Sequence, residues 1–73
     1  MIKYFQTLEN VNFLKIDTES LDATLLFIRR GQKFKSNVVN IESYNAMLED
    51  VKNVDVWKES DETTFNDMLS QIP

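Results

Sequence analysis

The sequence predicts an α+β domain: a small, mainly antiparallel sheet of four to five strands with two C-terminal helices on one face. Two observations support this fold class. Residues 1–40 are rich in β-branched and aromatic types, which favour strands. Residues 41–73 contain two stretches in which apolar residues recur every three or four positions, as on one face of a helix. A chain of 73 residues builds one hydrophobic core, so we expect a single domain over residues 1–73.

Residues 2–17 favour a β-hairpin. Two runs, residues 2–8 and 11–17, consist largely of β-branched and aromatic types. Only Glu9-Asn10 separates the runs, and such a short connection is typical of a hairpin. We therefore expect the two runs to pair as antiparallel strands.

Residues 21–30 fit two secondary structures. As a helix, the segment would have Ser20 at its N-cap and Gly31 just past its last turn, which are favoured positions for these residue types. As a strand, the apolar run of residues 24–28 would lead through the turn at Gly31 into residues 32–35, forming a second hairpin. A run that is apolar on every side has no helical stripe, so we favour the strand and keep the helix as the alternative.

Residues 34–57 predict a strand, a helix and a further short strand. The first strand covers residues 34–40, and Asn40 or Ser43 caps the helix that follows. Residues 54–57 alternate as in a short strand, and we expect it to run parallel to residues 34–40 because a helix joins the two. The apolar residues of the helix fall on one stripe, which we expect to be buried: Ile41, Tyr44, Leu48 and Val51.

The last amphipathic stretch predicts a C-terminal helix. Ser60 is its expected cap, and Asp61 and Glu62 occupy the first turn, where negative side chains are favourable. Its apolar residues again fall on one stripe, which we expect to pack on the sheet: Phe65, Met68, Leu69 and Ile72.

The composition argues against catalysis. The chain has no cysteine and no histidine, which excludes disulfides and removes the usual ligands of zinc and other transition metals. Its single glycine is too few for a glycine-rich phosphate loop. Adjacent carboxylates at positions 49–50 and 61–62 diverge on a helix and do not face each other as an acid–base pair would. We expect a non-catalytic module with no cofactor and no metal site.

The charge of the chain is uneven. Residues 1–40 carry six basic and four acidic residues (net +2), whereas residues 41–73 carry two basic and eight acidic residues (net −6). One compact basic segment, residues 29–35, is a candidate binding surface for a protein. The alternative is a nucleic-acid-associated regulator, in which the cations contact phosphates and Phe34 stacks on a base. The four cations are Arg29, Arg30, Lys33 and Lys35.

Two aromatic residues refine these alternatives. In a strand, Phe34 points away from its neighbours Lys33 and Lys35, so we expect its ring to enter the core while the lysines are solvated. Nucleic acid is therefore the less favoured partner. Trp57, the only tryptophan, is a further candidate binding residue because indoles are favoured at interfaces, and its alternative role is to close the small core.

Size and composition also suggest partners and location. A domain this small without a disulfide or metal is marginally stable, so we expect stabilisation by a protein partner, by self-association, or by both. The first residues offer neither a signal peptide nor a membrane span, and we expect no membrane contact. The cysteine-free composition suits a reducing compartment, and we expect a cytoplasmic protein.

Residues 33–57 predict a strand–helix–strand unit. The first strand opens with Phe34 and ends on the pair Val38-Val39, the helix covers residues 40–49, and the closing segment carries Val54-Asp55-Val56 before Trp57. This unit, about a third of the chain, resembles small accessory proteins of tailed bacteriophages. The resemblance implies a non-catalytic role in virion assembly or as an inhibitor of a host protein, and a place in the host cytoplasm or the virion.

Overall fold

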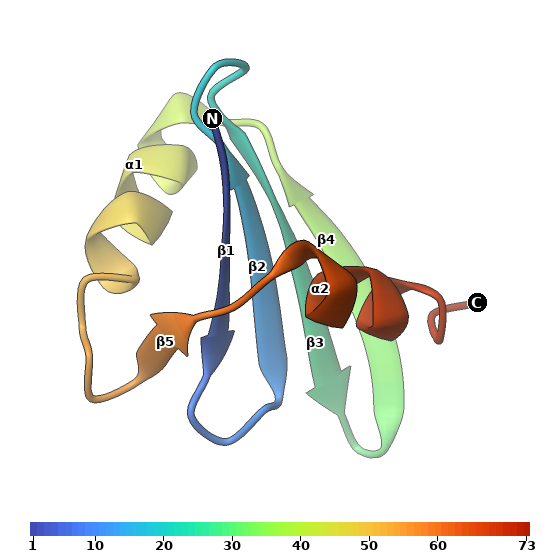
Figure 1. Cartoon of the computed structure of the whole chain (residues 1–73). Coiled ribbons are helices and arrows are strands. Elements are labelled where there is room, and N and C mark those ends of the chain that lie inside the picture. The colour runs from blue at the N-terminus through green and yellow to red at the C-terminus, as the bar shows by residue number, and fades with distance from the viewer.

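The structure, a computed structural model that describes residues 1–73, is a five-stranded antiparallel sheet with a helix on each face (Figure 1). The strand order is β4-β3-β2-β1-β5, so the first four strands form a meander and the chain then crosses by a helix to place β5 beside β1. The predicted α+β class is confirmed. The elements are β1 (Ile2–Thr7), β2 (Asn12–Asp17), β3 (Asp22–Arg29), β4 (Gln32–Val38), α1 (Ile41–Asp50), β5 (Trp57–Glu59) and α2 (Glu62–Leu69).

The ambiguous segment is a strand, as we favoured. It forms β3, which pairs with β2 on one side and with β4 on the other. The turn to β4 consists of Arg30 and Gly31, whose φ angles of 53° and 76° are both left-handed. Left-handed φ at both central residues is the pattern of a type I′ hairpin turn, whose twist matches that of the flanking strands. Gly31 adopts this conformation without steric cost.

The two helices cover opposite faces of the sheet, which corrects our prediction that both lie on one face. Along β2, Phe13 packs in a cluster with Phe65 of α2, whereas Leu14 and Ile16 pack in a separate cluster with Tyr44 of α1. Neighbouring residues of a strand point to opposite faces, so these clusters lie on the two sides of the sheet. Figure 1 shows α2 in front of the sheet and α1 behind it.

The short strand after α1 also differs from our prediction. It begins at Trp57 rather than ending there, and it pairs antiparallel with β1, with Gln6 opposite Lys58, instead of parallel with residues 34–40. The cause is local. The side-chain oxygen of Asn53 accepts a hydrogen bond from the N–H of Asp55 at 3.0 Å, and its carbonyl accepts from the N–H of Trp57 at 2.9 Å. These bonds hold residues 54–56 in a turn despite their strand-like alternation.

The helix starts follow the sequence in part. Asn40 caps α1, as one of our two alternatives held, because its side-chain oxygen accepts from the N–H groups of Glu42 and Ser43. The cap of α2 is Asp61, which accepts from the N–H of Thr64 at 2.7 Å. The predicted cap, Ser60, instead donates its hydroxyl to Gln6 of β1.

The predicted apolar stripes face the sheet, with one exception. Three stripe residues, Tyr44, Phe65 and Met68, are buried, and four others are half-buried. Ile41 is 51% exposed, so the stripe of α1 begins one turn later than we expected. The half-buried stripe residues are Leu48, Val51, Leu69 and Ile72.

Truncating one core residue on each face tests this two-sided arrangement. Leu14 faces α1 and Leu26 faces α2, and both are fully buried. We expect Leu14→Ala and Leu26→Ala each to lower the free energy of unfolding by about 2–5 kcal/mol, whereas Leu69→Ala, at a half-buried position, costs less. Urea unfolding followed by Trp57 fluorescence measures all three. A near-neutral effect at either leucine would show that its face carries no core.

Candidate functional site

The β3–β4 hairpin brings four of the five predicted site residues together. Arg29 ends β3, Arg30 lies in the turn, and Lys33 and Lys35 lie on β4. All are exposed except Lys33, which is half-buried. No acidic residue occurs between Asp22 and Glu42, so the hairpin carries +4 while the rest of the chain carries −8. We call residues 23–38 the basic hairpin.

The register of the basic hairpin places its lysines and its aromatic rings on opposite faces. Phe34 lies opposite Phe27, whereas Lys33 lies opposite Ile28 and Lys35 opposite Leu26. Leu26 belongs to the cluster under α2, so the two lysines point to the α2 face and the two phenylalanines to the α1 face. The rings are stacked, with centroids 5.3 Å apart and 24° between their planes.

Phe34 does not enter the core, contrary to our expectation. It is 38% exposed because α1 does not extend over the turn of the basic hairpin. The cluster under α1 includes Ala23, Leu25 and Val38 but neither Phe27 nor Phe34. Sequence reasoning missed this aromatic pair. The predicted turn at Arg30-Gly31 already carries the signal, since a two-residue turn there fixes position 27 opposite position 34, but this register was not worked out from it.

Two open hollows flank β4. One, of about 520 Å³, lies at the hairpin turn and is lined by Arg29, Arg30, Gln32 and Phe34. The other, of about 620 Å³, lies between β4 and the C-terminal residues Ile72 and Pro73, with both lysines on its wall. Side chains of another molecule therefore have room beside the cations and the exposed ring.

Trp57, the fifth predicted site residue, lies away from the basic hairpin. It is on β5, at the opposite edge of the sheet from β4, and is only 6% exposed. Its indole Nε1 donates a hydrogen bond to Asp50 Oδ2 at 3.0 Å, which fastens β5 to the end of α1. The structure gives Trp57 the alternative role that we considered, that of closing the core.

A separate cleft of about 400 Å³ lies between α1 and β1. Its floor is apolar, and its rim carries two lysines and one carboxylate, Glu49, which pairs with Lys52 at 3.0 Å. The Glu49 side chain is 75% exposed, so this ion pair lies at the surface of the cleft. Its apolar residues are Phe5, Ile16, Leu48 and Val51.

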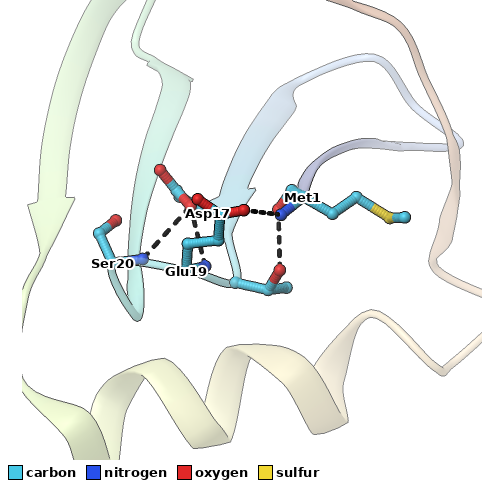
Figure 2. Close-up of polar contacts among 5 residues, drawn as sticks. Met1, Asp17, Glu19 and Ser20 are labelled. Atoms are coloured by element: carbon cyan, nitrogen blue, oxygen red, sulfur yellow. Dashed lines mark hydrogen bonds and ion pairs between the residues drawn. The ribbon is translucent and has the colours of Figure 1, made fainter.

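A polar cluster closes the turn between β2 and β3, at the end of the sheet opposite the turn of the basic hairpin (Figure 2). The backbone N–H groups of Glu19 and Ser20 donate to Asp17 Oδ1 at 3.0 and 3.3 Å, and the Met1 amine lies 3.5 Å from Glu19 Oε1. The two backbone hydrogen bonds stabilise the charged form of Asp17 and lower its pKa. A carboxylate held in this way fixes a turn and fastens the N-terminus, and it is a poor proton acceptor.

Beyond the basic hairpin, two further features were sought in the structure. No three Asp or Glu side chains are grouped so that they could hold a metal ion, and neither helix has the length and apolarity needed to cross a membrane. Comparison of the chain with protein-family models, curated proteins and solved structures finds no match.

Acid titration tests the hydrogen bonds of Asp17 and of the α2 cap. Backbone hydrogen bonds lower the pKa of both Asp17 and Asp61 below their ordinary value of 3.8. Each group therefore contributes stability that is full above that value and is lost as the pH falls through the lower folded pKa. We expect the stability advantage of the wild type over Asp17→Asn, measured by urea unfolding, to shrink as the pH falls from about 5 through the lowered pKa. An advantage that does not change with pH would contradict the assignment.

Proposed function

We propose that this chain is a small non-catalytic protein-interaction module that binds an acidic partner through its basic hairpin. The observation that carries the proposal is the local composition of this surface: four cations, no carboxylate, and a half-exposed pair of stacked phenylalanines. Aromatic and arginine side chains are enriched where proteins bind one another. The stacked rings offer apolar contact area, and the cations select the charge of the partner.

Charge segregation supports an acidic partner. A surface of +4 on a chain whose remainder carries −8 attracts acidic molecules to one end and repels them from the rest, which orients the encounter. A second copy of this chain also presents acidic residues, so head-to-tail self-association is one form of the same interaction. The resemblance of residues 33–57 to phage accessory proteins suggests virion assembly or inhibition of a host protein as the setting.

Exposure of Phe34 favours a second candidate, nucleic-acid binding. A half-exposed ring beside Arg29 and Arg30 is the kind of platform on which a base stacks. Lys33 and Lys35, however, point to the other face of the sheet and away from the ring. Only two of the four cations therefore accompany Phe34, which makes a small phosphate-binding footprint, and we favour the protein partner.

A comparison of two quadruple variants tests the main proposal. The chain has eight basic residues, four in the basic hairpin and four elsewhere. We expect the hairpin variant Arg29→Ala/Arg30→Ala/Lys33→Ala/Lys35→Ala to lose proteins that the wild type captures, and the purified captured protein to form a stoichiometric complex in sedimentation. The matched control, Lys3→Ala/Lys15→Ala/Lys52→Ala/Lys58→Ala, removes the same charge and should retain them. Equal loss in both variants would show that only net charge matters and would contradict a hairpin site.

Salt dependence separates the second candidate from the first. We expect no binding of a single-stranded DNA or RNA 20-mer tighter than about 10⁻⁴ M at physiological salt, measured by fluorescence anisotropy. Sub-micromolar binding would instead support nucleic acid if log K falls with log salt at a slope of roughly −3, as about four phosphate contacts require, and if Arg29→Ala/Arg30→Ala abolishes it.

A further inference from the structure

The outer edge of β4 is free. In the strand order β4-β3-β2-β1-β5, β4 has a neighbour on one side only, and none of the backbone hydrogen bonds outside the helices and strands involves residues 32–38. Alternate N–H and C=O groups along this edge therefore face outward without a protein partner. The edge is seven residues long, against three at β5, and most of its residues are exposed.

The two lysines decide what can pair with this edge. Natural proteins place lysine on edge strands because it discourages pairing with identical strands. Antiparallel pairing of β4 with β4 of a second copy would bring Lys33 and Lys35 of both copies close together, and like charges across strands are destabilising. A strand that carries carboxylates would instead be attracted to the two lysines. The charge of the edge thus disfavours a second β4 and favours an acidic segment.

The alternation of β4 specifies the pattern of that segment. Lys33 and Lys35 point to the α2 face, whereas Phe34 points to the α1 face beside Phe27. A strand added to the edge has the same alternation, so its side chains also divide between the two faces. Carboxylates fit beside the lysines and apolar side chains fit beside the rings. The hollows on the two sides of β4 leave room for both sets.

We propose that β4 accepts an extended segment of a partner protein as a sixth strand of the sheet, and that acidic and apolar residues alternate in this segment. This inference rests on the proposed function and specifies its mode. Backbone hydrogen bonds supply affinity that does not depend on the partner's sequence, the lysines select charge, and exposed Phe34 with half-buried Phe27 selects apolar side chains.

Three seven-residue peptides with blocked ends test this mode. One alternates Glu with Val and Phe, one has the same composition in an acidic and an apolar block, and one is the alternating peptide with an N-methyl group on every backbone amide, so that neither of its edges can donate. We expect the alternating peptide to shift the NMR resonances of β4 and slow the exchange of its outward amides. The other two should bind at least about tenfold more weakly, since each loses either the pattern or the backbone hydrogen bonds.

Two variants tie binding to the edge. Lys33→Glu/Lys35→Glu should weaken the alternating peptide by at least about tenfold, because it turns attraction into repulsion, and Lys33→Gln/Lys35→Gln should weaken it less. The control Lys52→Glu/Lys58→Glu changes charge equally, away from β4, and should have little effect. Circular dichroism confirms that each variant is folded.

The outcomes separate this inference from the proposed function. Equal binding of all three peptides, with loss in Lys33→Glu/Lys35→Glu, would overturn strand addition and leave a charge-selective hairpin surface. No binding of the alternating peptide at millimolar concentration would also overturn strand addition. The proposed function would still be supported if capture of a partner protein by the wild type depends on the hairpin cations. A dimer of the free chain that is strengthened in Lys33→Gln/Lys35→Gln would place β4 of a second copy on the edge and contradict the acidic segment.

Discussion

β2 is apolar on both faces, and the rest of the structure depends on burying both. Phe13 points to one side and Leu14 and Ile16 to the other, so each side of the sheet needs a covering layer. The chain supplies two short helices, which at 1.5 Å per residue span about 15 and 12 Å. Five strands about 4.8 Å apart make a sheet roughly 19 Å wide. Each helix therefore covers only part of its face.

Incomplete cover creates the candidate site. On the α1 side, the helix packs over Ala23 and Leu25 and leaves Phe27 and Phe34 to stack on each other in contact with solvent. Phe34 lies on β4, the edge strand of the sheet, which also carries Lys33 and Lys35. The short helices thus leave an aromatic, basic surface next to an open strand edge. A partner that occupies this surface would complete the cover that the chain itself does not provide.

Local patterns in the sequence predicted most helices and strands. The features that they did not predict depend on contacts between residues far apart in the chain. The first hairpin and the strand at residues 22–29 follow from residue types and turn signals, and the two helical stripes follow from spacings of three and four. All of these signals depend on neighbours in the chain. The placement of the helices on opposite faces depends on which side of β2 each stripe meets. The exposure of Phe34 likewise depends on how far α1 reaches. Four cations of the site could be predicted because they are adjacent in sequence, whereas Trp57 lies in the core at the other edge.

Hydrogen exchange of individual amides in the free protein, followed by NMR, tests most directly whether the edge of β4 is open. Amides of β4 that face β3 should be protected, as should those of the buried strands β2 and β3. The alternate β4 amides that face outward should exchange almost as fast as in an unstructured chain, at every protein concentration. Strong protection of these outward amides in the free chain would show that its edge is already covered, and would contradict a surface held open for a partner.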